Sequence, residues 1–513
     1  MRNTIRFSWL LLLPLLFTLS SCNDDLLTEQ PSNFLAPTNF YRNANDAQIA
    51  LAGLYAGQMR VQGYVGGDAG VALLWGLHGT DEIIIPPWAP AGRLSLFLWN
   101  FNPTLDVIET VYQRHYEEIN RINTVLNRVG MMGEDQISDE VRADVLAQAK
   151  ALRASFYFNL VRLYNRVPLV LEERENLENL EFTQAEPGEI YAQVVKDLTE
   201  AIAVLEPASN VSRISKGAAQ ALLGKVYLQM GGWPLKQTEK YADAASQFGA
   251  VIASNQYALL EDFQQVFDYE NELNDEMVWV VQHDGPGVNI DGTQNSNLGT
   301  FMGPAGRLEE GAGWGTAWLA TKLENTFERE DLRRRVSVAY APAPRVMEGD
   351  STEGPNQWKP WKWQKPNPNN WGNDTPFDYP YIRYANVLLG FAEADARANG
   401  TVTQEAVNAI NLVRARARGD ADPNKVLVPY TTAMPLEEFI DAVLEERYLE
   451  LAFEGHRKGD LIRTERAVEV MSSLEKQTAV WPGAPEPAEY KQLWPIPQSV
   501  LDLNPALKQN PGW

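Results

Sequence analysis

The densest group of side chains suited to acid–base or metal chemistry lies in the segment 445–460. Glu446, Glu450 and Glu454 recur every four residues, so a helix would place their carboxylates on one face. Beside the imidazole of His456, such carboxylates could bind a metal ion or transfer protons. The alternative is a structural ion-pair network at the end of a helix, with the nearby charged residues Arg447, Arg457 and Asp460.

The rest of the sequence carries no recognisable catalytic motif. Gly455 directly follows the three glutamates and fits the turn that ends a helix, which favours the ion-pair interpretation. The sequence has no nucleophile elbow, no phosphate-binding Gly/Lys loop and no zincin motif, and Cys22 is its only cysteine. Among 67 acidic residues, the paired carboxylates of a glycosidase cannot be singled out. The sequence therefore predicts a protein that is not an enzyme.

Tryptophan is the residue whose distribution points to a ligand. The chain has 15, and four of them fall in 357–371, where proline and asparagine exclude a regular helix or a central strand. An exposed indole offers an apolar face and one N–H donor, which suits stacking on a pyranose ring. Packing inside a subdomain is the alternative for each of them. The grouped tryptophans are Trp75, Trp88, Trp99, Trp314, Trp318, Trp358, Trp361, Trp363 and Trp371.

The N-terminus has the layout of a lipoprotein signal. A short basic start is followed by the apolar run 7–19, which is too short to span a bilayer, and then by small residues before Cys22. Two or more acyl chains of the palmitate type on this cysteine would anchor the protein stably. We therefore expect a signal peptide over 1–21 and an acylated N-terminus with a tether over 22–40.

The charge of the chain limits its partners. Removing Arg2 and Arg6 with the signal changes the formal net charge from −23 to −25. Such a surface repels nucleic acid and anionic lipid headgroups but accepts neutral or cationic ligands. No later apolar run is long enough to cross a membrane, and 513 residues can bury a large core.

Helical patterns dominate two regions, 41–260 and 381–513. Leu223-Gly224 with Tyr227, followed by Ala244 and Phe248, matches the two-helix signature of a tetratricopeptide repeat. One such pair cannot bury its own face, so several must stack, although a generic helical bundle fits the same pattern. The segments with helical periodicity or capping signals are 45–55, 104–129, 138–164, 188–205, 215–230, 238–254, 382–398, 404–418 and 435–453.

The region 261–380 is rich in Gly, Pro, Asn and Trp and has little periodicity. A structureless loop of that length is implausible, so we expect an irregular subdomain laid over the helical scaffold. Short strands are predicted at Met277–Val281 and Val336–Tyr340, and an extended tail at 490–513. Carboxylates and asparagine carbonyls in the irregular region make a structural calcium ion possible, although no contiguous ligand loop marks one.

Taken together, the motifs resemble the SusD/RagB family of outer-membrane nutrient-binding lipoproteins. The resemblance covers nearly the whole chain, and the motifs occur in the order usual for the family. Asn165 stands where the family usually has glycine. The matching segments after the lipoprotein signal are 148–168, 216–228, 382–394, 446–457, 493–497 and 504–513.

The resemblance implies a tetratricopeptide-like helical scaffold with an irregular ligand-binding subdomain and no catalysis. It also implies a partner, a SusC-like TonB-dependent outer-membrane transporter that the lipoprotein covers as a lid. In the family, a loop near 80–82 and the aromatic residues after it often face the ligand. The resemblance thus implies five ligand-binding residues: Asp81, Trp88, Arg93, Trp99 and Asn100. From the grouped tryptophans we add Trp314, Trp358, Trp361, Trp363 and Trp371 as expected ligand-binding residues.

The leading hypothesis is capture of an oligosaccharide or polysaccharide at the surface of a Gram-negative cell by a lipid-anchored protein that faces the exterior. A protein that binds peptides or another nutrient for the same transporter is the alternative. A surface glycosidase is the third. The sequence does not identify the sugar or its linkage.

Overall fold

The computed structural model describes residues 40–65, 68–174, 181–207, 213–283, 296–303, 306–308, 311–340, 358–363, 375, 377–474 and 485–513. The predicted signal peptide, Cys22 and the tether lie outside these residues, as does Trp371. The boundaries predicted at 40, 260 and 380 stay predictions.

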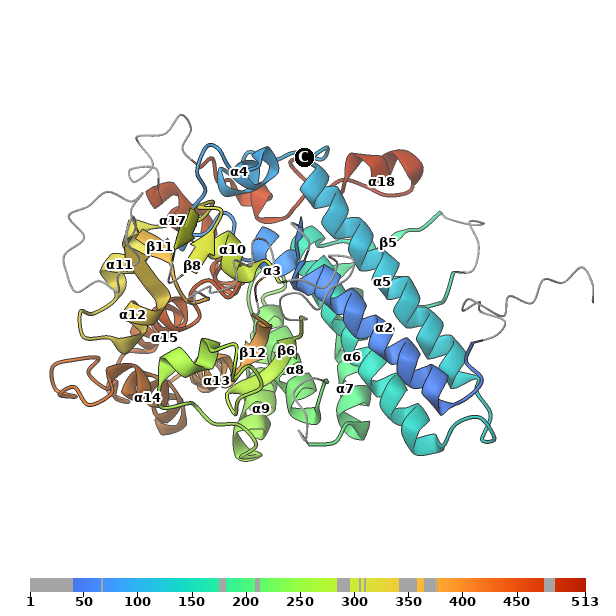
Figure 1. Cartoon of the computed structure of the whole chain (residues 1–513), viewed down its shortest axis with the longest axis horizontal. Coiled ribbons are helices and arrows are strands. Elements are labelled where there is room, and N and C mark those ends of the chain that lie inside the picture. The colour runs from blue at the N-terminus through green and yellow to red at the C-terminus, as the bar shows by residue number, and fades with distance from the viewer. Residues whose placement is uncertain are drawn as a thin grey trace, which may run out of the picture.

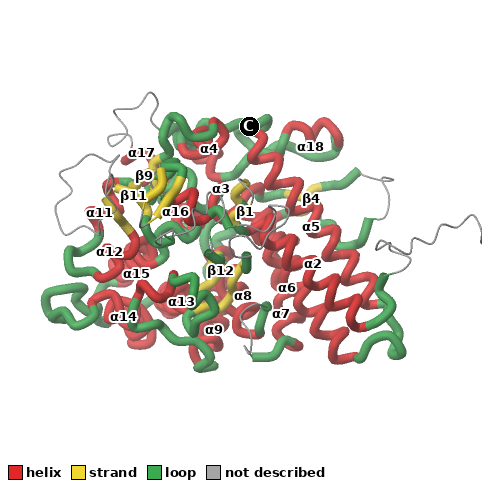
Figure 2. Tube along the Cα trace, in the orientation of Figure 1, coloured by secondary structure: helices red, strands yellow, loops and turns green. Residues whose placement is uncertain are grey.

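The described structure is mainly helical, as the sequence predicts (Figures 1 and 2). None of its helices is long and apolar enough to cross a membrane. The helices are α2 (Ala44–Gln62), α3 (Val71–Leu74), α4 (Ala91–Phe97), α5 (Asp106–Gly130), α6 (Asp139–Tyr164), α7 (Pro187–Val204), α8 (Lys216–Gly231), α9 (Lys240–Ala253), α10 (Leu298–Met302), α11 (Thr321–Thr326), α12 (Leu332–Ser337), α13 (Tyr384–Asn399), α14 (Gln404–Arg418), α15 (Leu436–Glu450), α16 (Arg457–Arg463), α17 (Ala467–Ser473) and α18 (Gln498–Leu503), with 3-10 turns η2 (Phe263–Phe267) and η4 (Glu489–Gln492).

Capping side chains set several of the predicted helix starts. The Ser138 hydroxyl accepts from the Val141 N–H at the start of α6, and the Ser215 hydroxyl accepts from the Ala218 N–H at the start of α8. The predicted range 404–418 is the observed extent of α14, and the Thr403 hydroxyl caps this helix by accepting from the Ala406 N–H. The first helix, α2, extends seven residues beyond the predicted Tyr55, because its buried face continues to Gln62.

The long helices pack as successive antiparallel neighbours in one row. Contacts run from α5 to α6, α7, α8 and α9, and α9 then packs on α13, which packs on α14. In Figure 1 this row crosses the molecule from α5 on the right to α14 on the left. Helix pairs stacked in this way bury a continuous core, which is the tetratricopeptide-like arrangement.

Phe248 of α9 fills the space between two glycines on neighbouring helices. A Cβ atom on Gly224 of α8 would lie 2.8 Å from Phe248 Cδ1, and a Cβ atom on Gly390 of α13 would lie 2.8 Å from Phe248 Cζ. Because a real Cβ does not approach that closely, both positions require glycine. The motif pair Leu223-Gly224 and Ala244…Phe248 thus meets a second Leu-Gly pair, Leu389-Gly390, around one ring.

The strands are short and pair in twos: β1 (Tyr64–Val65) with β2 (Asp68–Ala69), β3 (Ile83–Ile84) with β9 (Trp318–Leu319), β4 (Val167–Pro168) with β5 (Gln184–Ala185), β6 (Met277–Val281) with β12 (Tyr379–Arg383), β7 (Gly306–Leu308) with β8 (Gly311–Gly313), and β10 (Val338–Tyr340) with β11 (Trp358–Pro360). The predicted strand at Met277–Val281 is confirmed, and every residue of β6 and β12 is buried. Since β12 runs directly into α13, this pair attaches the irregular region to the helical row (Figure 2).

Two predicted extended segments are partly helical. Val336 and Ser337 belong to α12, and only Val338–Tyr340 forms a strand, because the Asp331 carboxylate caps the helix by accepting from the Arg333 N–H. The tail, predicted to be extended over 490–513, contains η4 and α18.

The three carboxylates predicted on one helical face lie in the interior, where cations neutralise them. Glu446 lies 2.5 Å from Arg333 Nη1 and 2.7 Å from Arg414 Nη1. Glu450 Oε1 lies 2.6 Å from Arg416 Nη2. Carboxylates and cations are equal in number in this network, whose members are Glu276, Asp331, Glu446, Glu450 and Glu454 with Arg333, Lys362, Arg383, Arg414 and Arg416.

The ion-pair interpretation of the 445–460 segment is therefore confirmed. Gly455 makes the expected turn with φ 76°. Of the nearby charged residues expected in this network, Arg447 pairs with Asp460 at 2.8 Å, and Arg457 pairs with Asp81. The cations that neutralise the three glutamates come from other elements, and nothing in the local sequence indicates them.

A first prediction concerns the packing around Phe248. Gly390→Ala gains about 1 kcal/mol of helix propensity but overpacks a ring already held by Gly224, at a cost of about 1–3 kcal/mol. We expect a net loss of free energy of unfolding, measured by urea titration. Gly53→Ala in α2, where an added Cβ meets no atom within 4 Å, is the matched control and should stabilise the protein. Equal effects of both substitutions would contradict this packing account.

Candidate functional site

Three segments that are far apart in sequence meet on one side of the helical row. Strand β3 pairs with β9, and the Ala320 N–H donates to the Glu82 carbonyl at 3.1 Å. The Trp314 N–H donates to the Thr300 carbonyl of α10 at 2.9 Å. These bonds join the segment 78–100 to the segments 296–303 and 311–320. They bring together tryptophans that lie far apart in the sequence.

The meeting of these segments creates a cluster that we call the aromatic face: Trp88, Arg93, Phe301, Trp314 and Trp318. The Arg93 guanidinium carbon lies 5.0 Å from the Phe301 ring centroid and 5.7 Å from that of Trp314. The rings of Trp88 and Trp318 meet edge to face, with centroids 5.0 Å apart. Stacking on two aromatic rings restrains the guanidinium and fixes the direction of its donors.

Trp88 is the part of the aromatic face most open to solvent. Its side chain is 65% exposed, although it is held by a ring contact to the buried Trp318. Trp314 is half-buried. An exposed indole offers an apolar surface and one hydrogen-bond donor, which suits a sugar ring. Arg93 is buried, and its guanidinium packs on Phe301 and Trp314. The structure thus places Trp88 on Trp318 and Arg93 on Trp314, in segments that the pairing of β3 with β9 joins.

Asp81 is placed differently from the expectation, because its carboxylate is committed to two cations inside the protein. Its oxygens lie 2.8 and 2.9 Å from two nitrogens of Arg457, and one of them lies 2.9 Å from Lys322 Nζ. Burial alone would raise the pKa of Asp81, but the charges and hydrogen bonds of Arg457 and Lys322 outweigh it and lower the pKa. The side chain has no exposed surface. Asp81 therefore fixes the loop beneath the aromatic face.

Trp99 is also part of this base. Its indole is fully buried and donates to the Gly79 carbonyl at 3.2 Å. Gly79 has φ 74°, and a Cβ atom there would lie 2.6 Å from Trp99 Nε1. The Lys458 ammonium lies 4.9 Å from the Trp99 ring centroid. The ring has no side open to a ligand, because its surroundings are filled by the protein itself.

The remaining predicted residues are scattered. Asn100 is exposed and lies at the end of the segment that carries Trp99. Trp361 is half-buried, and its N–H donates to the Ser337 carbonyl at 2.7 Å. Trp358 lies in β11, where the structure describes the strand but not the side chain. The structure does not bring these residues into the aromatic face, and their roles in binding stay predictions.

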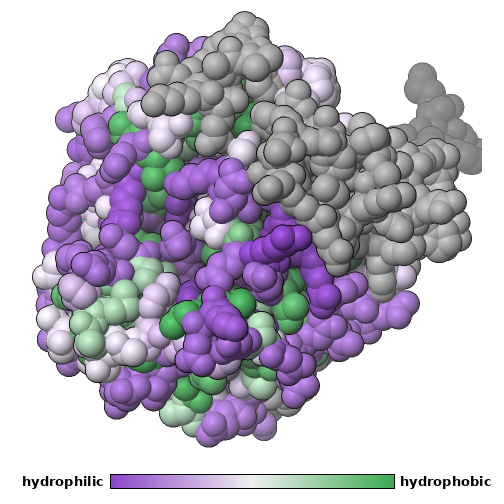
Figure 3. Space-filling model, turned by 90° about the vertical axis from the view of Figure 1, so that its left-hand side faces the viewer, coloured by the Kyte–Doolittle hydropathy of each residue, from purple (hydrophilic) through white to green (hydrophobic). Residues whose placement is uncertain are grey.

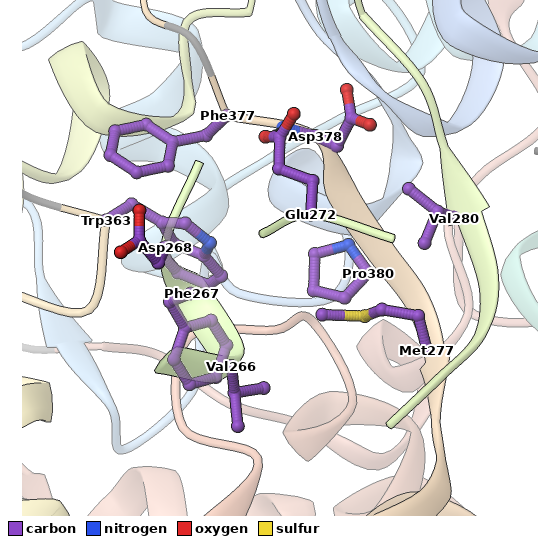
Figure 4. A pocket seen from close by; sticks show the side chains of 10 residues that line it. All are labelled: Val266, Phe267, Asp268, Glu272, Met277, Val280, Trp363, Phe377, Asp378 and Pro380. Atoms are coloured by element: carbon purple, nitrogen blue, oxygen red, sulfur yellow. Dashed lines mark hydrogen bonds between the residues drawn. The ribbon is translucent and has the colours of Figure 1, made fainter. Parts of the chain in front are cut away.

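Trp363 is buried beside a separate hollow of about 270 Å³, part of which is open solvent (Figure 4). Phe267 packs edge to face on Trp363 with centroids 5.8 Å apart. Glu272 and Asp378 lie close together at this hollow, and Glu272 accepts from the Asp378 N–H at 2.6 Å. Burial and the charge of Asp378 raise the pKa of Glu272 to about 8. Trp363 thus contributes a packed wall here and is separate from the aromatic face.

The described residues include no group of three or more His, Cys, Asp and Glu side chains that could hold a metal ion. His456 Nε2 lies 3.0 Å from the Asn386 amide nitrogen, while Asn386 Oδ1 accepts from Arg447. Because the amide nitrogen donates, this imidazole nitrogen carries no proton. His456 is thus a neutral acceptor within the interior.

Two members of the aromatic face were not among the predicted ligand residues. Trp318 was noted only as a neighbour of Trp314, and Phe301 was not noted at all. Phe301 lies in a five-residue helix, α10, that has no periodicity to reveal which side it presents. Only the long-range pairing of β3 with β9 indicates that Trp318 reaches Trp88, and only the folded structure brings Phe301 to Arg93.

The side of the molecule at the left of Figure 1 is mostly hydrophilic, with apolar residues in small scattered groups (Figure 3). The view shows no broad apolar area in the part that the structure describes. A polar surface with an exposed aromatic ring, such as that of Trp88, is the composition expected for binding a hydroxyl-rich ligand.

Comparison with known protein families supports these observations. A profile described as "SusD family" matches residues 333–513, and one described as "Starch-binding associating with outer membrane" matches residues 97–228. The curated "SusD-like protein P2" of Formosa agariphila is 28% identical, over 97% of this chain and 98% of its own length.

Solved structures share the fold. A SusD homolog from Bacteroides thetaiotaomicron superimposes with a TM-score of 0.77 at 24% identity, over 93% of this chain and 98% of that one. A structure titled "Laminarin binding SusD-like protein" superimposes with a TM-score of 0.75 at 26% identity, over 92% of this chain and 100% of that one.

A second prediction concerns Glu82, which is fully buried below the aromatic face and accepts from the Phe453 N–H at 3.0 Å. Burial raises its pKa to about 8, so the folded state holds a proton that the unfolded state releases above about pH 4.5. The contribution of Glu82 to stability is therefore complete below pH 4.5 and declines as the pH rises to 8.

Glu82→Gln keeps a neutral side chain of the same size and removes this titration. We expect the free energy of unfolding to fall less between pH 5 and pH 8 in Glu82→Gln than in the wild type, by at least about 1 kcal/mol. Urea unfolding at several pH values measures the difference. Parallel pH profiles would show that Glu82 is ionised in the folded protein.

Proposed function

Because the chain belongs to the SusD family, we propose that it captures a glycan at the cell surface and delivers it to a TonB-dependent transporter of the outer membrane. The protein acts by binding and not by catalysis. The observation that carries the glycan assignment is the aromatic face, where the exposed Trp88 packs on Trp318 and the half-buried Trp314 packs on Arg93. The laminarin-binding relative supports the same ligand class.

The chemistry of the face favours a sugar over other nutrients. Trp88 offers a flat apolar surface for the C–H face of a pyranose, and Arg93 offers donors to the hydroxyls at its edge. The base of the face is rigid, since Asp81 and Trp99 hold the loop by ion pairs and packing. A preorganised face loses little entropy when ligand binds. The formal net charge of −23 would attract a cationic peptide, so the binding test includes peptides.

A third prediction tests the ligand class. Calorimetry with soluble β-glucan, α-glucan and mannan oligosaccharides, and with a peptide mixture, should show binding of at least one glycan and not of the peptides. Incubation with the bound glycan should release no new reducing ends. Peptide binding without sugar binding would replace the glycan assignment, and release of reducing ends would make the protein a glycosidase.

Substitutions test the place of binding. Trp88→Ala and Trp314→Ala should each weaken glycan binding by at least about tenfold, or about 1.4 kcal/mol, because each removes an apolar platform. Trp88→Phe should retain part of the affinity. Trp233→Ala, which alters a half-buried tryptophan between α8 and α9, is the control and should bind normally. Undiminished binding by both alanine variants would place the ligand elsewhere.

The cellular location follows from the N-terminus and the family. Cys22 ends a lipoprotein signal, and we infer that its acyl chains hold the protein at the outer membrane, facing the exterior. Anchoring confines the protein to the same surface as its SusC-like transporter and so raises its effective concentration there. Anchoring therefore contributes to transport and not only to location.

A fourth prediction separates binding from transport. Cys22→Ala, exported in soluble form, should bind the glycan with unchanged affinity in calorimetry, because the aromatic face is intact. Uptake of the same glycan by cells that carry only this variant should fall at least about tenfold, since the effective concentration is lost. Uptake at the wild-type level would show that the anchor is dispensable for delivery.

A further inference from the structure

A second hollow lies among α6, α8, α13, α15 and α16, and cations dominate its lining. It encloses about 380 Å³, part of which is open solvent. Arg162 comes from α6, Lys225 from α8, Arg447 from α15 and Arg463 from α16. The only acidic residue in the lining is Asp460. This concentration of positive charge is unusual in a chain whose formal net charge is −23.

The carboxylates near the hollow are already shared among several guanidiniums. Asp460 lies 2.8 Å from Arg447 Nε and 2.9 Å from Arg463 Nη2. Glu393, just outside the lining, lies 2.5 Å from Arg463 Nη1 and 3.1 Å from Arg397 Nε. These two acids therefore neutralise at most two of the three arginines bound to them.

Arg162 and Lys225 add two further cations to this lining. Arg162 donates to Asn159 Oδ1 at 2.7 Å and lies over the rings of Phe158 and Trp75, at 4.1 and 4.9 Å from their centroids. The Lys225 ammonium lies 5.1 Å from the Tyr381 ring centroid. Within the described residues, neither cation forms an ion pair, and the Lys225 ammonium forms no hydrogen bond. Both residues are half-buried, and the four cations of the lining share the single lining carboxylate of Asp460, so positive charge is in excess here.

The network around Glu450 differs from this hollow in its balance of charge. There, buried carboxylates and cations are equal in number and alternate in space. At the hollow, the four cations Arg162, Lys225, Arg447 and Arg463 line the wall with one carboxylate, that of Asp460. Glu393 pairs with Arg463 just outside the lining, and Glu454 attracts Lys225 from the neighbouring network. One fold thus contains a neutralised interior network and, beside it, one with an excess of positive charge.

We propose that this hollow binds a small anion of the carboxylate or sulfate class between Arg162 and Lys225. A planar guanidinium and an ammonium together satisfy several oxygens of such a group. Because the hollow is partly open to solvent, the anion can be a free ion or the acidic group of a larger molecule such as a uronic acid. The site is separate from the aromatic face, so a test of anion binding does not depend on glycan capture.

The electrostatic surroundings of Lys225 also suit an anion site. Burial, and to a smaller extent repulsion from Arg162 and Arg447, lowers the pKa of Lys225 to about 7 against the attraction of Asp460 and Glu454. Tyr381 and His456 also face it, and burial keeps His456 neutral with its pKa well below the ordinary value. A bound anion would stabilise the ammonium form and raise the pKa of Lys225.

The fifth prediction compares Lys225→Met with the wild type at pH 6, where Lys225 is largely protonated. Sodium sulfate at 10 mM or below should raise the Tm of the wild type by about 2 °C or more through linkage, and should not raise that of Lys225→Met. Lys236→Met, which removes an exposed lysine, is the control and should respond as the wild type does. Equal Tm shifts in all three proteins would overturn the proposal, because they would reflect general salting-out.

A second measurement uses the wild-type protein alone and so does not depend on the folding of a variant. NMR of protein labelled at the lysine Cε carbon should show the pKa of Lys225 rising by at least about one unit with saturating sulfate, a tenfold gain in proton affinity. An unchanged pKa would overturn the proposal. Acetate and glucuronate distinguish the source: equal effects support a free carboxylate ion, and a stronger effect of glucuronate supports an acidic sugar.

Discussion

The ion-pair network around Glu450 is the constraint on which the rest of the fold depends. Glu446, Glu450 and Glu454 enter the interior from α15 and the turn after it, and charges there are costly unless each is paired. Their partners come from α12, β12, α14 and the turn after β11. Burial alone would raise the pKa of Glu450, but Arg416, Arg383 and Arg333 hold it well below its ordinary value. The irregular region must therefore dock on the helical row in one arrangement.

The helix that carries the ion-pair network around Glu450 also restrains the aromatic face. Tyr448 of α15 donates to the Asp81 carbonyl at 2.7 Å, and Arg457 at the start of α16 holds the Asp81 carboxylate. The loop that carries Trp88 and Arg93 is thus tied to the same helix that supplies the glutamates. The exposed indole of Trp88 thus lies over buried ion pairs and hydrogen bonds. These hold the aromatic ring in a fixed place on a largely polar surface.

Much of the scaffold could be predicted from the sequence because its signals are local. Ser138 and Ser215 mark helix starts by capping, and the Gly224 and Phe248 motifs report close helix packing. The site was harder to predict, because the exposure of an indole depends on pairings far away in sequence. Trp88 and Trp99 lie in one short segment, yet the first is largely exposed and the second fully buried. Only the β3–β9 pairing and the Gly79 contact separate their roles.

The central claim is that ligand binds at the aromatic face, and hydrogen–deuterium exchange with and without bound oligosaccharide tests it most directly. Slower exchange confined to backbone amides of 86–100 and 298–320 is the predicted result, since both segments carry the rings beside Arg93. Protection that appears instead around the hollow beside Trp363, with no change in those two segments, would contradict the account.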